Sequence, residues 1–311
     1  MLLSTIIKEV FANNLQYTYW NEKEFSTLGI VASKVKQTMC TFVDSEKYLK
    51  ELPKNVTMVI TSPELKEAAM KVGKGSFGIM TVDNPRQFFF SLHNFLAEKE
   101  EYCRKEEDTV IDPTANISPL AYIAEKNVRI GRGVKVEPFV VIYENSEIGD
   151  DSVIRAGAKI GGQGFEFKRT EEGILPVKHL GGVKIGKHVE IQNNTCIDRA
   201  IYPWDDTSIG DYTKIDNLVH IGHAAKISEN VLIVANSGIG GRTVIGSDSW
   251  IGFGATLRNG IKIGENARAN MGSVVTKDVV ENESVTGNFA ISHEKFMQEL
   301  RQKVGKTDKS L

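Results

Sequence analysis

The sequence predicts an α+β N-terminal domain, then a left-handed parallel β-helix, and finally a short C-terminal α-helix. Three observations support this: an aliphatic residue recurs every six positions through most of the second part, glycine is concentrated there, and phenylalanine is concentrated before it. Only 4 of the 28 glycines lie in residues 1–105, whereas 8 of the 14 phenylalanines do. One compact domain would not divide its residues in this way, so we expect two architectures.

The six-residue repeat is most regular between residues 209 and 275, where Ala269 is its one weak member. A period of six fits neither a helix nor a simple strand alternation, but it is the signature of a parallel β-helix, in which three hexapeptides make one triangular turn. With the less regular stretches 111–160 and 185–197, the repeat predicts about eight turns. We expect Gly and Asn at corners that require a positive φ.

Two interruptions break this repeat. Residues 161–182 form a long excursion with glycines at both ends, and a loop that leaves a rigid solenoid commonly carries binding function. The second interruption, AIYPWDD at 200–206, places two aromatic residues around Pro203, and we expect it to bulge outward.

Residues 1–105 are predicted to be a separate domain, because strand-like and helix-like segments alternate there as in an α/β unit. The predicted strands are 28–33, 41–43, 56–62 and 77–82, and the predicted helices are 45–52, 63–72 and 85–102.

The β-helix is assigned to residues 106–290, and a C-terminal helix and tail to 291–311. Residues 293–304 are predicted to form one amphipathic helix with Ser292 as its N-cap. Its apolar stripe, suited to packing or trimer contacts, consists of Phe296, Met297, Leu300 and Val304.

Composition excludes several classes of protein. The net charge of −2 and the lack of a basic run argue against nucleic acid as a partner. No apolar stretch approaches the roughly 20 residues that span a bilayer, and the first residues do not resemble a signal peptide. Three widely spaced cysteines do not form a disulfide framework, so we expect a cytoplasmic protein.

The segment 214–226 carries the strongest candidates for chemistry. His223 lies two positions after the inward-facing Ile221, so we expect it to point outward, where an imidazole can act as a base at neutral pH. Asp216 lies seven residues earlier and could hold the imidazole tautomer. Gly241 lies one turn after His223, where a backbone N–H could stabilise an oxyanion.

A zinc site is the rival interpretation of this segment, since His220 and His223 are three residues apart and Asp216 is near. Residues at that spacing diverge across a β-helix corner, and no cysteine cluster accompanies them. We therefore predict no metal.

These residues resemble those of a known family, the UDP-3-O-acylglucosamine N-acyltransferases of lipid A synthesis. The resemblance covers most of the chain and is carried by IGGQGFEF at 160–167, by 178–200, and by IGDYTKIDNLVHIGHAAKIS at 209–228. It implies a homotrimer with active sites between neighbouring prisms, and an acyl thioester as co-substrate.

The resemblance also implies roles for individual residues. His223 matches the general base, Asp216 the orienting acid and Gly241 the oxyanion donor. The uracil-stacking pattern F-x-x-N-x-x-Y is matched by Phe42 and Tyr48, with Ser45 in place of the asparagine. Their alternative role is packing in the domain core. His179, in the segment 178–200, is assigned to substrate binding.

The chain also departs from the family. A second active-site histidine is absent, since residues 258–260 are Arg-Asn-Gly, and residues 271–290 resemble the exit of coenzyme A-dependent acetyltransferases. We therefore favour N-acylation of a nucleotide-linked amino sugar of the dTDP-4-amino-4,6-dideoxysugar type in surface-glycan synthesis. Acyl-CoA is preferred over acyl carrier protein, no cofactor is tightly bound, and Arg258 is placed near the pantetheine arm.

Four alternatives stay open. The protein could be the lipid A enzyme itself, an O-acyltransferase, a zinc lyase of the γ-carbonic anhydrase type, or a non-catalytic solenoid scaffold. A scaffold would not explain the separate N-terminal domain or the polar segment 214–226.

Overall fold

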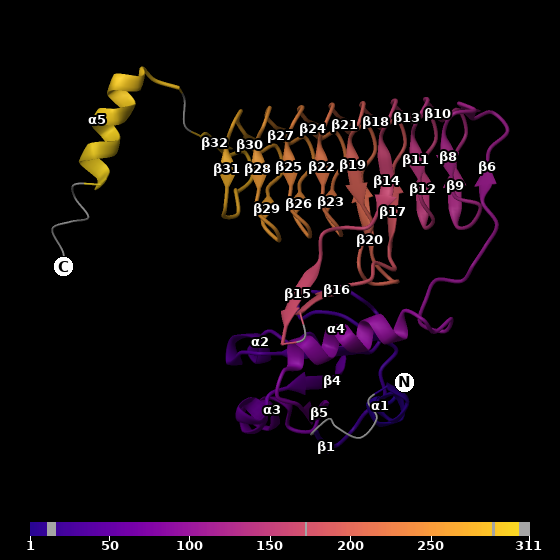
Figure 1. The fold of residues 1–311 in the computed structure, drawn as a ribbon, viewed down its shortest axis with the longest axis vertical. Coiled ribbons are helices and arrows are strands. Elements are labelled where there is room, and N and C mark those ends of the chain that lie inside the picture. Colours follow the sequence, from indigo (N-terminus) through magenta and orange to yellow (C-terminus); the bar gives the residue numbers. More distant parts are fainter. Residues whose placement is uncertain (11–16, 172, 288–289, 305–311) are drawn as a thin grey trace.

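The computed structural model describes residues 1–10, 17–171, 173–287 and 290–304. Figure 1 shows a prism of stacked coils, an N-terminal domain below it, and a helix after the last coil. The predicted fold class is confirmed. Among the residues described, no helix is long and apolar enough to cross a membrane.

The N-terminal domain is built on a five-stranded sheet of order β1-β5-β4-β3-β2, in which β1 is antiparallel to β5 and the other pairs are parallel. Its strands are β1 (Thr18–Trp20), β2 (Thr27–Leu28), β3 (Met39–Val43), β4 (Val56–Thr61) and β5 (Gly78–Thr81). Its helices are α1 (Leu3–Val10), α2 (Glu46–Lys50), the 3₁₀ turn η1 (Pro63–Leu65), α3 (Lys66–Gly73) and α4 (Pro85–Leu96).

Two predicted elements of this domain are wrong in extent: the helix predicted over 85–102 ends at Leu96, and the strand predicted over 28–33 is shorter. Only Thr27–Leu28 of the region around 28–33 pairs with β3. The chain then turns, because the Ser33 N–H donates to the Ile30 carbonyl at 2.8 Å and the Ser33 hydroxyl accepts from the Ile30 N–H at 3.0 Å. A local side-chain bond of this kind competes with strand pairing.

The prism consists of three parallel sheets with eight, nine and eight strands, which agrees with the prediction of about eight turns. The first sheet holds β6 (Val110–Ile111), β9 (Val128–Ile130), β12 (Ser146–Ile148), β17 (Gly182–Ile185), β20 (Asp206–Ile209), β23 (Lys226–Ile227), β26 (Val244–Ile245) and β29 (Lys262–Ile263). The second holds β7 (Asn116–Ile117), β10 (Lys135–Val136), β13 (Val153–Ile154), β18 (Glu190–Ile191), β21 (Lys214–Ile215), β24 (Leu232–Ile233), β27 (Trp250–Ile251), β30 (Arg268–Ala269) and β32 (Ser284–Val285). The third holds β8 (Tyr122–Ile123), β11 (Val141–Ile142), β14 (Lys159–Gly162), β19 (Cys196–Asp198), β22 (His220–Ile221), β25 (Gly238–Ile239), β28 (Thr256–Leu257) and β31 (Val274–Val275).

The axis of the prism is filled by the aliphatic positions of the repeat. Ile221 lies in register between Ile197 of the coil before and Ile239 of the coil after, and all three are buried. β-Branched side chains suit this stacking on a pleated surface. The ladder is the driving force for folding, since each isoleucine leaves water only when its neighbouring coils are in place.

Asn and Gly occupy many of the positive-φ corners, as expected, but not all of them. Several positive-φ corner positions carry ordinary residues, among them Ala224 (58°) and Arg242 (60°). The glycine that follows an aliphatic residue is required instead by the next coil. A Cβ at Gly222 would lie 2.7 Å from the backbone nitrogen of Gly241, and one at Gly240 would lie 2.6 Å from that of Asn259.

The two interruptions of the repeat dock the N-terminal domain onto the prism. The first contains the antiparallel hairpin β15 (Phe167–Thr170) and β16 (Gly173–Pro176), which lies beside α4 in Figure 1. On α4, His93 Nε2 hydrogen-bonds the Lys178 carbonyl at 2.9 Å and the Asn94 side chain donates to the Pro176 carbonyl at 2.7 Å.

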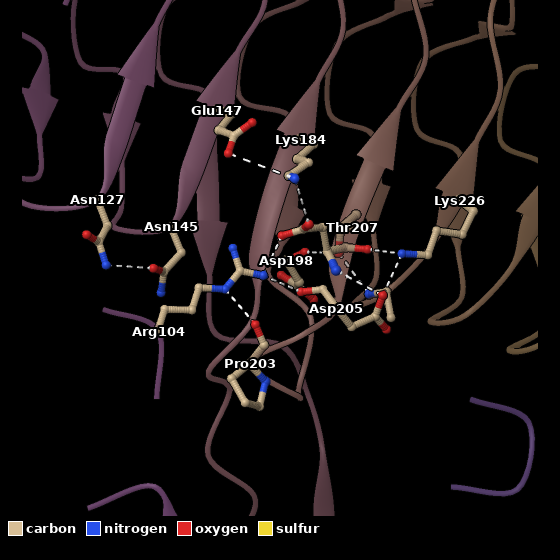
Figure 2. Close-up of polar contacts among 12 residues, drawn as sticks. Arg104, Asn127, Asn145, Glu147, Lys184, Asp198, Pro203, Asp205, Thr207 and Lys226 are labelled. Atoms are coloured by element: carbon tan, nitrogen blue, oxygen red, sulfur yellow. Dashed lines mark hydrogen bonds and ion pairs between the residues drawn. The ribbon is translucent and has the colours of Figure 1, made fainter. Parts of the chain in front are cut away.

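The second interruption bulges outward as predicted and also contacts the N-terminal domain. The Trp204 indole stacks on Tyr202 at 5.5 Å and donates a hydrogen bond to the Leu28 carbonyl at 2.9 Å. Figure 2 shows Arg104 at the base of this bulge, where it donates to the carbonyls of Pro203 and Asp205 at 2.7 and 2.8 Å. The bulge therefore fixes the domain close to one edge of the prism.

The C-terminal helix α5 (His293–Val304) occupies the predicted residues. The Lys295 N–H is 3.4 Å from the Ser292 hydroxyl, as expected of the predicted N-cap. Phe296 and Leu300 of the predicted stripe are exposed.

Candidate active site

Two predicted positions stack along one edge of the prism, at the corner that follows the third sheet. His223 follows β22, and Gly241 follows β25 one coil later. Both interruptions leave the prism from this same edge, after β14 and β19, in the coils just before that of His223. The edge therefore brings the N-terminal domain and the predicted base to the same side of the molecule.

His223 points outward from the prism, as its spacing after Ile221 predicts, but it is not open to solvent. Its side chain is only 5% exposed. The excursion 161–182 covers it, and Gly164 packs so closely that a Cβ there would lie 3.2 Å from the Cβ of His223. The Ala224 N–H beside it donates to the buried Thr207 hydroxyl at 2.8 Å, which holds the corner in place.

A carboxylate that the sequence analysis did not single out contacts this imidazole. Glu166, from the excursion, places Oε2 3.1 Å from His223 Nε2. Its other oxygen pairs with Lys168, and Arg242 lies 3.8 Å from Oε2. Glu166 lies within the segment GFEF of the excursion 161–182. An acidic residue between the glycines of this excursion is the one sequence signal that could have identified Glu166 as a site residue.

The Glu166 carboxylate is held in its charged form. Burial alone would raise the pKa of Glu166, but the hydrogen bonds from His223 and Lys168 and the charge of Arg242 outweigh burial and lower it to about 2. The site therefore contains a permanent negative charge at every pH at which an acyltransferase would work.

Gly241 lies directly against the ring of His223. A Cβ at Gly241 would be 2.8 Å from His223 Nε2, so only glycine fits there. Among the described residues, no carbonyl or side chain is paired with the Gly241 N–H. An amide N–H next to a buried imidazole is the arrangement that an oxyanion donor needs.

We expect Gly241→Ala to lower kcat about 100-fold, because the methyl group would displace the His223 ring and a shift of about 1 Å costs on that order. The matched control is Gly238→Ala in β25 of the same coil, where a Cβ would meet only Thr256 at 3.9 Å. Steady-state kinetics of both variants checks this. Equal activity of the two would contradict the placement of Gly241 in the site.

The structure does not bring Asp216 to His223. It lies at the preceding corner, between β21 and β22, where Oδ1 accepts from the Asn217 N–H at 2.7 Å and Oδ2 from the Ala235 N–H at 3.2 Å. The described contacts give Asp216 the role of tying two coils together, and the carboxylate beside His223 is that of Glu166.

His179 does lie beside the predicted base. The two rings are 5.6 Å apart at 75°, and His179 Nδ1 hydrogen-bonds the Val177 carbonyl at 3.0 Å. Burial, and then the nearby His223, lower the pKa of His179 to about 4, so it is neutral at pH 7. Its Nε2 is buried and, in the described part of the chain, has no hydrogen-bond partner.

His220 and His223 face different carboxylates. His220 Nε2 is 3.7 Å from Asp198 Oδ2, whereas His223 Nε2 faces Glu166. Burial raises the pKa of Asp198, against the effect of the two histidines. No group of three or more metal-ligating side chains occurs in the described ranges. The geometry therefore does not assemble the set His220, His223 and Asp216.

The remaining predicted residues lie further out. Phe42 packs on Phe89 and Phe90, with ring centroids 5.0 and 5.9 Å away, and is only partly buried. Ser45 is the N-cap residue of α2, and Tyr48 is exposed on that helix.

Arg258 is exposed at the same edge of the prism as His223 and Gly241, in the coil after Gly241. No contact of its guanidinium was found among the described residues, so its predicted role near the pantetheine arm stays a prediction.

Family models of known proteins match two parts of the repeat. Residues 127–162 match the bacterial transferase hexapeptide family, and residues 242–277 match the hexapeptide repeat of succinyl-transferase. The UDP-N-acetylglucosamine acyltransferase of Arabidopsis superposes with a TM-score of 0.46 at 23% identity, over 61% of this chain and 77% of that chain.

Curated relatives carry one common name. UDP-3-O-acylglucosamine N-acyltransferase of Rickettsia akari is 53% identical over 100 residues, which are 32% of this chain and 28% of the relative. The enzyme of that name from Bordetella pertussis is 28% identical over 286 residues, 80% of this chain and 77% of the relative. The chain therefore contains hexapeptide repeats of the bacterial transferase type and is similar in sequence to UDP-3-O-acylglucosamine N-acyltransferases.

Proposed function

We propose that this protein transfers an acyl group from an acyl thioester to the amino group of a UDP-linked, 3-O-acylated glucosamine. The observation that carries the proposal is the contact between the buried His223 imidazole and Gly241, at the edge onto which the N-terminal domain docks. The names of the curated relatives support the choice of sugar and nucleotide.

The chemistry requires one base and one oxyanion donor. The sugar amine attacks the thioester carbonyl, a C–N bond forms, and His223 takes the amine proton. The Gly241 N–H stabilises the oxyanion of the tetrahedral intermediate. When the C–S bond breaks, His223 returns the proton to the departing thiolate, so the imidazole is neutral again.

The UDP sugar replaces the dTDP-linked amino sugar as the favoured acceptor, because the relatives are named for a UDP-linked substrate. The choice between acyl-CoA and acyl carrier protein, the homotrimer and the cytoplasmic location stay predictions.

The nucleotide base is proposed to stack on the exposed Tyr48 ring and the accessible part of Phe42, with Ser45 between them in sequence. Arg86 lies beside this proposed stacking position. Its guanidinium is 5.6 Å from the Phe42 ring centre and forms an ion pair with Asp44 at 2.6 Å. A base held by aromatic rings tolerates the replacement of Asn by Ser better than one held by hydrogen bonds to its edge.

We expect the full chain to acylate UDP-3-O-acylglucosamine, and UDP sugars to raise its melting temperature, because a ligand of the folded state stabilises it. Tyr48→Ala should raise KM for the sugar about tenfold or more, since one stacking contact is worth about 1–3 kcal/mol. Tyr122→Ala, which alters an exposed tyrosine on β8, is the control.

The assay pairs each acceptor, UDP-3-O-acylglucosamine or a dTDP-4-amino-4,6-dideoxysugar, with acyl-CoA and with acyl carrier protein thioester. Product from the dTDP sugar alone would overturn the proposed acceptor. No product in any combination, together with no thermal shift, would overturn the enzymatic function.

A further inference from the structure

We propose that Glu166 is the positioning residue of His223: its carboxylate binds Nε2–H, holds the imidazole in the Nε2–H tautomer, and leaves Nδ1 as the atom that takes the proton of the sugar amine. This inference rests on the proposed function only for the identity of the substrate. The assignment of tautomer can be tested on the protein alone.

The contact is built into the fold. Glu166 and His223 are 57 positions apart in sequence, yet their side chains are 3.1 Å apart and only 12% and 5% exposed. The backbone of Glu166 is fixed on both sides, because its N–H donates to the Gly164 carbonyl at 3.2 Å and its carbonyl accepts from the Val177 N–H at 2.9 Å.

The hydrogen-bond roles follow from the chemistry of the pair. An ionised carboxylate can only accept, so the neutral imidazole must carry its hydrogen on Nε2. Nδ1 then has a free lone pair. This atom is buried and, within the described residues, has no hydrogen-bond partner. A buried nitrogen that the protein leaves unpaired is the atom to which a substrate proton can be transferred.

The Glu166 carboxylate faces the imidazolium that the reaction would form on His223. Once His223 is protonated, it and Glu166 form a charge-assisted hydrogen bond in a site shielded from water. Lys168 and Arg242 also contact Glu166 and keep its carboxylate ionised. The other facing groups are His179, which is neutral, and Asp198, which lies toward His220.

The test compares Glu166→Gln with Glu171→Gln, an exposed glutamate at the turn of the same excursion. Glutamine keeps the size and the accepting oxygen but removes the charge. We expect Glu166→Gln to lower kcat by about 10- to 100-fold, the effect of one charge-assisted hydrogen bond, with KM for the UDP sugar unchanged. Glu171→Gln should behave as the wild type.

A second readout needs no substrate. Imidazole nitrogen shifts of protein labelled with ¹⁵N-histidine, assigned with His223→Ala, report the tautomer. We expect Nε2–H for His223 in the wild type and a mixture of tautomers in Glu166→Gln. An Nδ1–H tautomer in the wild type, or unchanged kcat in Glu166→Gln, would overturn the role of Glu166.

His223→Ala separates this inference from the proposed function. If His223→Ala is inactive and Glu166→Gln is fully active, the proposed base stands and the positioning role fails. If Glu166 acts through His223, the double variant with His223→Ala and Glu166→Gln should have the same kcat as His223→Ala alone. Further loss in the double variant would contradict that route.

Discussion

His223→Ala is expected to lower kcat by about 10²- to 10⁴-fold while the β-helix remains folded, because proton transfer by a placed base is worth that much. The variant removes an imidazole that is off the axis, so the Ile197–Ile221–Ile239 ladder is untouched. Initial rates at saturating acyl donor and acceptor, together with circular dichroism, measure both parts of this expectation.

The control for that variant is His188→Asn. His188 lies at another corner, stacked on Tyr212 at 4.8 Å, with a φ of 55° that asparagine also tolerates. It should retain wild-type turnover. Near wild-type turnover of His223→Ala itself would show that the amine needs no protein base, and the mechanism given above would fail.

Stability is expected to fall as the pH is lowered from 6.5 toward 4, because two buried histidines resist protonation. Burial lowers the pKa of His93 to about 4, and burial and His223 lower that of His179 to about 4. The unfolded chain, with a histidine pKa near 6.5, therefore binds more protons than the folded one in this window. Each histidine contributes up to about 3 kcal/mol to the free energy of unfolding. This contribution is fully present above pH 6.5 and is lost as the pH falls toward 4.

Urea unfolding at pH 7, 6 and 5 measures this slope. His179→Gln should show a smaller loss of unfolding free energy between pH 7 and pH 5 than the wild type, because one titrating group is gone. Glu166 adds nothing in this range, since its pKa is about 2 and its contribution is lost only as the pH falls below about 4.5. A pH-independent unfolding free energy would contradict the burial of these two imidazoles.

Much of the architecture could be predicted from the sequence because its cause is local and repeated. Aliphatic residues at every sixth position can be buried together in a ladder along the axis of a β-helix. Residues Ile209 to Val275 keep that spacing without interruption. Most of the N-terminal strands and helices were also predictable. The elements α1 and β1 were not predicted, and near Ile30 the Ser33 hydroxyl ends a strand that composition favours.

The site was only partly predictable. The repeat placed His223 and Gly241 one coil apart at one edge, since 18 residues make one turn. It placed Asp216 about one prism face away from His223, and the structure shows that Asp216 pairs with backbone N–H groups at its own corner. The uracil-stacking positions Phe42 and Tyr48 came from a family resemblance, and their role stays a proposal.

The sequence by itself determined the coil period, the buried ladder and the stacking of His223 with Gly241, because each depends on spacing along one regular element. Only the tertiary structure decided that His223 is buried, that Glu166 is its partner, and that the N-terminal domain docks at this edge. These contacts join an irregular excursion to a corner 57 residues away, and no periodicity relates such positions. Their geometry follows from how the hairpin packs between α4 and the prism.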